Sequence, residues 1–402
     1  MRKNVVLEHI VLGIFFVAPI LFRTGVAQEQ QPSSCIECHE DVKEEFETSI
    51  HSHIGIQCVD CHGGNPGDLD PDRSMARSAG FRGDYQDDQP PFTKRETVEM
   101  CASCHADRKR MKPFGIPTDQ FDQYKTSQHG MALYRKGDEH VAACIDCHGN
   151  HDILPPSDPK SRVYLLNIPQ MCANCHSDEA LMKLYDLSTD SYQKYIGSVH
   201  GVALLERGER GAPECARCHG AHGAMPPGVT EVSSVCGQCH RNTRDYFNRS
   251  PHKKAMDEKL IKECVSCHNH HAISASSQGM FDTICIKCHE EGTWAYEHGQ
   301  KIKAILVEAE GRVADVLKDM ERAEVRGIDI DTEKGILEEA KTNLIQALPV
   351  QHTLSVIEVE RYTTKAKSVA QEVDSRIQAI FSSQRRRRWA LGGVWVFILF
   401  TV

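Results

Sequence analysis

The sequence predicts a mainly α-helical protein with three parts: short helices with little regular structure around them, an amphipathic helical bundle and a C-terminal membrane segment. Three observations lead to this fold class. All 18 cysteines occur in one short motif that recurs between Cys35 and His289. After His298 the apolar residues take helical spacing, and the last residues are mostly apolar. These observations divide the chain into residues 1–27, 28–298, 299–384 and 385–402.

The overall charge argues against one class of partner. The 402 residues carry a formal net charge of -9, with an isoelectric point near 6.2. A nucleic-acid-binding protein usually shows a basic domain or stripe, so we expect no nucleic-acid partner. The apolar share of 40% is ordinary for a soluble protein and excludes a polytopic membrane protein.

The N-terminal region has the layout of a secretory signal peptide. Arg2 and Lys3 precede an apolar run at 10–22, and small residues end at Ala27, where cleavage is expected. The run is shorter than the roughly 20 apolar residues that span a bilayer; an uncleaved anchor is the alternative. We therefore expect export to the periplasmic side of a bacterial inner membrane.

Every cysteine belongs to a Cys-x-x-Cys-His motif, and nine copies account for all 18 cysteines. The cysteines are Cys35, Cys38, Cys58, Cys61, Cys101, Cys104, Cys144, Cys147, Cys172, Cys175, Cys215, Cys218, Cys236, Cys239, Cys264, Cys267, Cys285 and Cys288. The histidines that close the motifs are His39, His62, His105, His148, His176, His219, His240, His268 and His289. This motif is the attachment site of a c-type haem. Two thiols can form thioethers to the vinyl groups of one porphyrin, and the adjacent histidine can bind the iron.

Two other uses of the cysteines fit the pattern less well. A disulfide scaffold gives no reason for a histidine after every second cysteine. A zinc array would combine the Cys-x-x-Cys pairs to give four ligands at a time, which an odd number of motifs cannot do evenly. We therefore expect nine covalently bound c-type haems, with the motif histidines as proximal iron ligands.

The cysteine-rich region contains an internal repeat. A segment recurs 71 residues further along the chain, so that Cys101, His129 and Cys144 match Cys172, His200 and Cys215. Each module holds one motif, an aromatic-x-x-Ser-x-His element, and a second motif that is often followed three residues later by another histidine. Four two-haem modules and a last haem at Cys285 make up the nine.

The histidines outside the motifs are candidates for the second axial position of the irons. Imidazole in that position gives an electron-transfer haem rather than an open one. The best candidates are His51, His129, His151, His200, His222, His252, His271 and His298. A ninth ligand would come from His53, His140, His270 or His352. We expect bis-histidine ligation at most or all of the irons.

The spacing of the motifs leaves about thirty residues of chain for each haem between Cys35 and His298. That is too little for a conventional apolar core in each module. We therefore expect stacked porphyrins to supply the buried surface, close enough to one another for electrons to pass between them.

Residues 299–384 are predicted to form three amphipathic helices. Apolar stripes run over 302–320 and 336–348, and a capping box at Ser355 and Glu358 opens the third helix. We expect these helices to clasp the haem region and to lead into the membrane. The alternative is that His352 reaches back to a haem.

The sequence ends in four arginines, 385–388, and an apolar stretch, 389–402. A run of this length covers about two-thirds of a bilayer core. We expect a short anchor or a membrane helix that continues past Val402, with the arginines paired to anionic headgroups. A solvated basic tail is the alternative.

Two kinds of segment resemble a known group of proteins. Cys-x-x-Cys-His-Gly-x-His occurs at 144–151 and 215–222, and Ser-x-His-Gly occurs at 127–130 and 198–201. These segments resemble the multihaem cytochrome c superfamily, which includes cytochrome c-554, quinol-oxidising NapC/NirT proteins, pentahaem nitrite reductase and octahaem hydroxylamine oxidoreductase. Nine haems before a membrane segment are also similar to the exported part of inner-membrane cytochromes fused to a dihaem cytochrome b. The resemblance covers about residues 35–385.

Two functions are compatible with the resemblance, and electron transfer is the one we expect. We expect a membrane-attached conduit that takes electrons from a quinol-oxidising membrane partner, such as a cytochrome b, and passes them to periplasmic or outer-membrane redox proteins. The alternative is a reductase or dehydrogenase of small nitrogen or sulfur compounds with one open haem. Pentahaem nitrite reductases usually carry Lys in place of the motif His at the active site, and no motif here does. No catalytic residue is therefore assigned.

Overall fold

The computed structural model describes residues 35–70, 92–225, 231–275 and 277–401. The predicted signal peptide, 1–27, lies outside these ranges. The described residues are mainly helical and none of them is in a β-strand, which confirms the predicted helical character. The chain divides into two compact units, one of Met1–Glu44 and Gln57–Phe81 and the other of Glu45–Ile56 and Arg82–Val402.

The first unit carries the first two motifs on short helices. These helices are α1 (Cys35–Cys38) and α4 (Cys58–His62). The helix α2 (Glu40–Thr48) begins in this unit and ends in the second. At the start of α4 the backbone N–H of Gln57 donates to the carboxylate of Asp60 at 2.8 Å. This bond satisfies a backbone donor at the helix start, where no intrahelical acceptor exists.

The cysteine-rich part of the second unit consists of short helices joined by loops and turns, as predicted. In chain order they are α3 (Ile50–His53), α6 (Lys94–His105), α7 (Arg108–Met111), η1 (Lys112–Phe114), α8 (Gln120–Thr126), α9 (Gln128–Met131), η2 (Ala132–Lys136), α10 (Cys144–His148), α11 (Ile168–His176), α12 (Glu179–Lys183), α13 (Ser191–Ile196), α14 (Val199–Gly201), η3 (Val202–Glu206), α15 (Cys215–His219), η4 (Val232–Gln238), α16 (Arg241–Asn248), α17 (His252–Asp257), α18 (Val265–His268), α19 (Met280–Thr283) and η5 (Cys285–Lys287). One small apolar cluster in this part joins Val98, Leu133, Val141 and Ala143.

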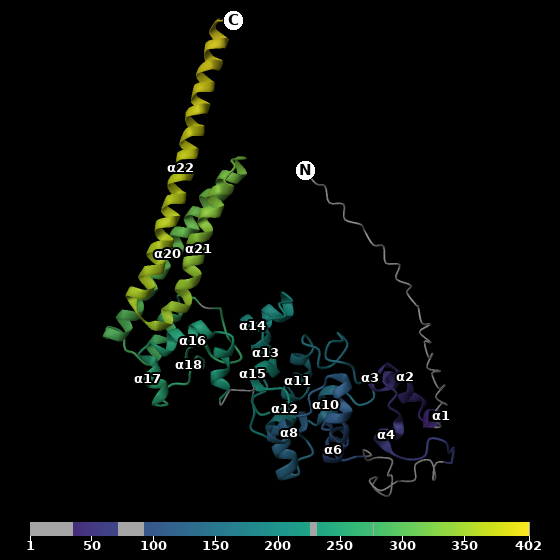
Figure 1. The fold of residues 1–402 in the computed structure, drawn as a ribbon. Coiled ribbons are helices and arrows are strands. Elements are labelled where there is room, and N and C mark those ends of the chain that lie inside the picture. The colour runs from purple at the N-terminus through teal and green to yellow at the C-terminus, as the bar shows by residue number, and fades with distance from the viewer. Residues whose placement is uncertain (1–34, 71–91, 226–230, 276, 402) are drawn as a thin grey trace, which may run out of the picture. The chain divides into compact units, whose positions relative to one another are not determined.

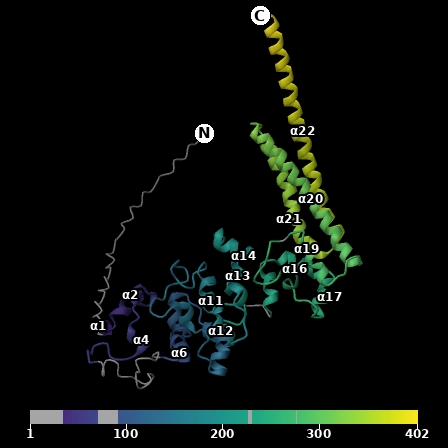
Figure 2. The same cartoon turned by 180° about the vertical axis from the view of Figure 1, so that it is seen from behind.

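The C-terminal part of the second unit is a bundle of three long helices. They are α20 (Trp294–Val325), α21 (Asp331–Val350) and α22 (Val356–Thr401), and the short turn η6 (Gln351–Thr353) joins the last two. The three helices lie side by side in both views (Figures 1 and 2), and α22 packs against both α20 and α21. The predicted apolar stripe at 302–320 lies within α20, and the one at 336–348 lies within α21.

Two apolar clusters hold the bundle together. The cluster nearer η6 joins Ile302, Leu306, Ala347, Val350 and Val359, all at most 1% exposed. The second cluster joins other buried residues of the same helices, namely Val313, Val316, Met320, Ala323, Ile330, Leu337, Ala340, Ala370, Val373 and Ile377. Most of the large, fully buried side chains of the described residues lie in these helices. The bundle therefore has a conventional hydrophobic core, unlike the cysteine-rich part.

The predicted C-terminal membrane segment is wrong. Within the residues that the structure describes, no helix combines the length and the apolar character that a membrane crossing needs. The physical reason is that, in the described part of α22, the apolar stretch past Arg388 is shorter than the roughly 20 residues that span a bilayer core. The structure instead continues α22 through the four arginines, and large apolar side chains such as Trp389 and Phe397 are exposed beyond them.

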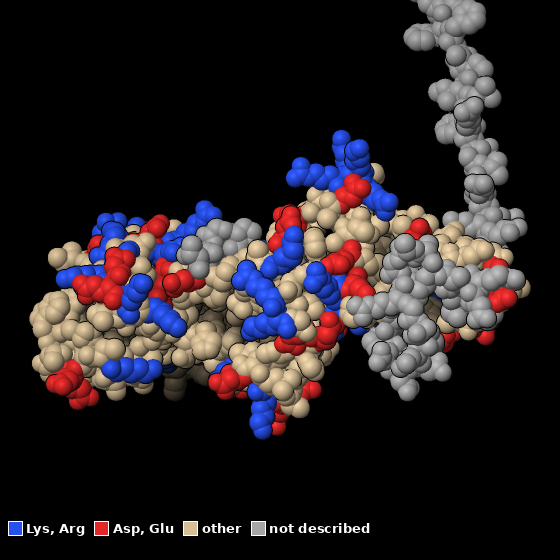
Figure 3. Space-filling view, turned by 90° about the horizontal axis from the view of Figure 1, so that it is seen from below, with Lys and Arg blue, Asp and Glu red and all other residues tan. Residues whose placement is uncertain are grey.

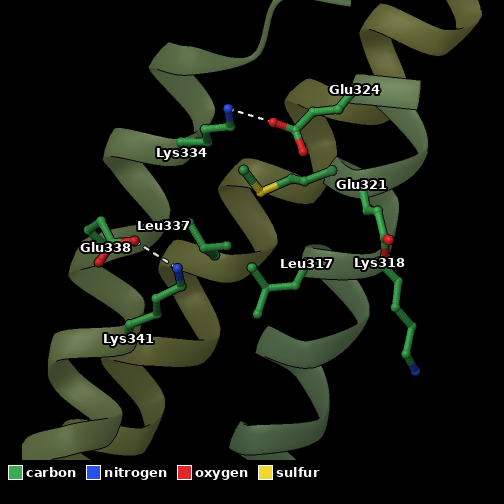
Figure 4. A pocket seen from close by; sticks show the side chains of 9 residues that line it. Leu317, Lys318, Glu321, Glu324, Lys334, Leu337, Glu338 and Lys341 are labelled. Carbon is green, nitrogen blue, oxygen red and sulfur yellow. Dashed lines mark hydrogen bonds and ion pairs between the residues drawn. The ribbon is translucent and has the colours of Figure 1, made fainter. Parts of the chain in front are cut away.

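The surface of the bundle carries a groove between α20 and α21 that is lined with charges of both signs (Figure 4). Lys334 forms an ion pair with Glu324 across the groove at 2.5 Å, and Lys341 pairs with Glu338 at 2.7 Å. Acidic and basic side chains are likewise interspersed on the face drawn in Figure 3. The groove holds none of the motif residues.

Candidate haem sites

The local structure of the motifs brings their three reactive side chains to one side. Residues i, i+3 and i+4 of a helix share a face, so a helical Cys-x-x-Cys-His segment presents both thiols and the imidazole together. The helices α4, α10 and α15 each consist of one complete motif, and α6 and α11 end on a motif histidine. This arrangement suits two thioether bonds and one iron ligand on the same porphyrin.

Carboxylates at the start of the motif helices fix their position. Asp146 accepts a hydrogen bond from the backbone N–H of Ala143 at 2.7 Å and another from Nζ of Lys94 at 2.9 Å. Glu214 accepts from the backbone N–H groups of Ala216 and Arg217 at the start of α15. Negative charge at a helix N-terminus is favourable because it faces the positive end of the helix dipole. Burial nevertheless raises the pKa of Glu214.

The thiols of successive motifs are neighbours. Within one module, the thiol of Cys215 raises the pKa of Cys172. Between modules, burial together with Asp146 and Cys175 raises the pKa of Cys147 to about 11. Cys101 with Cys144 and Cys236 with Cys264 are further neighbouring pairs within a module. Cys267 with Cys285 is a further pair between a module and the motif that follows it. The motifs of the second unit therefore follow one another in space in the order in which they occur in the sequence.

Seven motif histidines each face a histidine from outside the motifs. The ring centroids of these pairs are between 5.7 and 6.2 Å apart. The pairs, with the motif histidine second, are His51 with His105, His129 with His176, His222 with His148, His200 with His240, His271 with His219, His252 with His289 and His352 with His268. Two other ring contacts are closer: His270 to His271 at 4.7 Å and Trp294 to His298 at 4.8 Å.

The separation in the seven pairs fits one metal ion between two imidazoles. A metal–imidazole nitrogen distance of about 2 Å on each side, with the ring radii added, places the ring centroids about 6 Å apart. The narrow spread of the pairs matches such a bridge, whereas ordinary ring contacts range over about 4.5 to 7 Å. Among the described residues, no three or more His, Cys, Asp or Glu side chains gather as a metal site. The seven pairs thus each place two imidazoles at the separation that the axial positions of one haem would require.

Burial keeps these imidazoles in the form that binds a metal. Desolvation lowers the pKa of His148 to about 4, with His222 and His105 adding to the effect. Desolvation is also the main cause that lowers the pKa of His271 to about 4. A histidine must be neutral to ligate a metal ion, and a lowered pKa favours the neutral ring.

The pairs follow a fixed register along the repeat. The histidine of a Ser-x-His element faces the first motif of the next module, as His129 faces His176. The histidine that trails a second motif faces the second motif of the preceding module, as His222 faces His148. The third and fourth modules therefore each give one imidazole forward and one backward. We call this arrangement interleaved pairing.

The Ser-x-His-Gly element has a structural explanation at each position. In the second module the hydroxyl of Ser127 accepts from the backbone N–H of Gly130 at 2.9 Å and caps α9. The hydroxyl of Tyr124 donates to the carbonyl of Ala142 at 2.8 Å and ties α8 to the approach of the next motif. A Cβ atom on Gly130 would lie 1.9 Å from the carbonyl oxygen of Tyr124, so only glycine fits there. His129 is held between these fixed points.

The same element repeats in the third module. Ser198 accepts from the backbone N–H of Gly201 at 3.1 Å, and the hydroxyl of Tyr195 donates to the carbonyl of Pro213 at 3.0 Å. The backbone N–H of Val199 also donates to the carbonyl of Ile273 at 2.9 Å. The equivalent bond from Ile50 to Ile153, at 2.8 Å, joins the first Ser-x-His element to the loop after His151.

The remaining candidate histidines lie in several places. His39 and His62 close the motifs of the first unit, and His151 follows α10 as His222 follows α15. His53 ends α3, His140 is exposed beside Asp138 at 3.3 Å, and His270 lies against His271.

The structure favours His352 over His298 as a partner for a motif histidine. Nε2 of His298 lies 2.8 Å from the carbonyl oxygen of Leu354. A carbonyl can only accept, so this nitrogen carries a proton and donates. What separates the two histidines is the ring contact, since the ring of His298 lies against Trp294 with centroids 4.8 Å apart. His352, which the sequence left among the alternatives, instead faces His268. Its position past the end of α21, outside the repeat, gave no periodic signal that could have identified it.

Comparisons of the chain with protein-family models, with curated proteins and with solved structures find no match.

Proposed function

We propose that this protein is a nonahaem c-type cytochrome whose function is electron transfer. The observation that carries the proposal is the set of seven pairs, each of one motif histidine and one other histidine, with ring centroids about 6 Å apart. A bound c-type haem supplies an iron that changes oxidation state by one electron. The cysteines hold the porphyrin, and the paired imidazoles occupy both axial positions.

Two imidazoles on one iron favour electron transfer over catalysis, because no position is left for a substrate. The pairing covers both kinds of motif in the repeat: His176 and His240 are paired from the preceding module, and His148 and His219 from the following one. The neighbouring thiols of successive motifs, such as Cys147 and Cys175, support one continuous row of haems. Electrons would then move along the row in the order of the sequence.

The partners belong to the same proposal. A quinol-oxidising membrane protein would supply electrons, and periplasmic or outer-membrane redox proteins would receive them. Basic and acidic side chains are mixed on the face in Figure 3, so docking to either partner would rest on local contacts more than on one long-range field.

The test is to purify the protein from a host that attaches c-type haems and to measure haem and spin state. We expect pyridine haemochrome absorbance equal to nine haems per chain, and ferric electron paramagnetic resonance (EPR) that is dominated by low-spin signals. Haem well below nine equivalents would overturn the proposal. A strong high-spin signal that shifts with nitrite or hydroxylamine would replace electron transfer with the reductase alternative.

A further inference from the structure

We propose that the helical bundle supplies an axial ligand to the haem array: His352 is the sixth ligand of the haem that Cys264 and Cys267 attach. This inference rests on the proposed function and adds to it a role for the bundle. It assigns a metal ligand to a part of the chain that has no cysteine and no share in the repeat.

The interleaved pairing explains why this haem needs a ligand from elsewhere. The second motif of a module takes its partner from the histidine that trails the second motif of the next module, as in His148 with His222 and His219 with His271. After the module that contains His268, only the single motif that ends at His289 remains. The repeat therefore offers no trailing histidine to His268. His352 takes that place, with ring centroids 6.0 Å apart.

The turn η6 orients the ring of His352. Its Nδ1 lies 3.1 Å from the carbonyl oxygen of Pro349, which can only accept, so Nδ1 carries the proton. Nε2 is then the nitrogen with a free lone pair. A ring N–H bonded to a backbone carbonyl is the usual way in which proteins fix a histidine that binds a metal through its other nitrogen.

The surroundings of η6 hold the turn in one position. The hydroxyl of Thr353 donates to the carbonyl of Val350 at 2.8 Å, and His298 donates to the carbonyl of Leu354 at 2.8 Å. The turn also packs against α16, the helix that follows the motif of His240. His298 is therefore a positioning residue, which fixes the turn that carries the ligand.

A second contact joins the bundle to α16. Arg249, at the end of α16, forms an ion pair at 3.0 Å with Glu358 in the first turn of α22. Both side chains are more than a third exposed, so the pair adds little stability. It shows that the start of α22 lies close to the end of α16.

The experiment replaces His352 in the full-length protein. His352→Ala should keep nine haems and convert one of the nine irons to a high-spin form, as measured by ferric EPR. Added imidazole should return that iron to the low-spin form, because it can occupy the vacated position. The matched control is His140→Ala, since His140 is exposed and faces no motif histidine; its spectrum should equal that of the unmodified protein.

A second variant covers the case in which His352→Ala accumulates poorly. His352→Met keeps a ligand in place but should raise the reduction potential of one haem, because methionine in place of histidine raises the potential of a c-type haem. Nine low-spin haems in His352→Ala, or unchanged potentials in His352→Met, would overturn the inference and leave the proposed function standing. Fewer than nine haems in the unmodified protein would instead overturn the proposed function.

Discussion

At the scale of single residues, the chemistry of each candidate site depends on small groups that the haem would never touch. His129 can face His176 only because Ser127 caps the turn before it and Gly130 lets that turn approach α8. The aromatic ring of Tyr124 is fixed by its own hydroxyl bond to Ala142. The repeated element is thus a holder for one imidazole, and each of its positions has a steric or hydrogen-bonding reason.

Gly130→Ala should displace His129. The added Cβ would lie 1.9 Å from a backbone oxygen that cannot move aside without shifting α8. We expect a loss of about 1–3 kcal/mol in stability from overpacking, and a high-spin fraction at one iron in EPR. Gly211→Ala is the control because its Cβ would meet no atom within 4 Å. Equal thermal unfolding and equal spectra for the two variants would contradict this explanation of the element.

At the scale of elements, the sequence predicted the helices of the bundle. It also gave a set of candidate distal histidines, without saying which motif each one faces. The apolar spacing over 302–320 and the capping box at Ser355 reappear as α20 and as the hydrogen bond from the N–H of Glu358 to Ser355. The helical spacing of apolar residues predicts such local structure directly. Which histidine faces which motif depends on contacts across 70 or more residues, such as those of His148 with His222, and periodicity carries no information on these.

The wrong prediction of a membrane segment has an equally specific cause. The segment was inferred from composition near Trp389, but α22 runs through this stretch without reaching the length of apolar helix that a bilayer needs. The choice between His298 and His352 stays a prediction, and the ring contact of His352 with His268 favours His352.

The two ends of the bundle should differ in their effect on the haems. Leu306 lies in the cluster with Val350, next to the turn that carries His352, whereas Leu337 lies in the other cluster; both are 1% exposed. Leu306→Ala and Leu337→Ala should each cost about 2–5 kcal/mol of stability, measured by denaturant unfolding followed by circular dichroism. Only Leu306→Ala should also produce a high-spin signal. A signal of equal size in both variants would show that the bundle acts on the haems as one rigid block.

At the scale of the whole molecule, interleaved pairing makes the modules depend on one another. A module that took both imidazoles from its own chain segment could be removed or duplicated without effect on its neighbours. Here His222 faces a motif histidine in the module before its own, and His200 faces one in the module after. The iron–imidazole bonds would therefore stabilise the contacts between modules as well as the haems themselves.

Double variants can show that a ligand acts on the neighbouring module. His222→Ala combined with His148→Met should alter one iron in total, because both changes fall on the same predicted site. His222→Ala combined with His219→Met should alter two, although His222 and His219 are only three residues apart in the sequence. The measurement is the number of haems that lose the bis-histidine EPR signal. The opposite result, two altered irons and then one, would contradict interleaved pairing.

Histidines that face a motif earlier in the sequence, such as His222 opposite His148, would determine when each haem site is completed during synthesis. If the proposed haems are attached while the chain crosses a membrane from its N-terminus, Cys144 would reach the haem-attachment machinery well before His222, and that iron would wait with one side open. The wait is longest for the site of His268, whose partner arrives only with the turn after α21. Maturation of this site would then finish when the last helices fold, and in a chain stalled before that point the iron beside His268 would keep one side open.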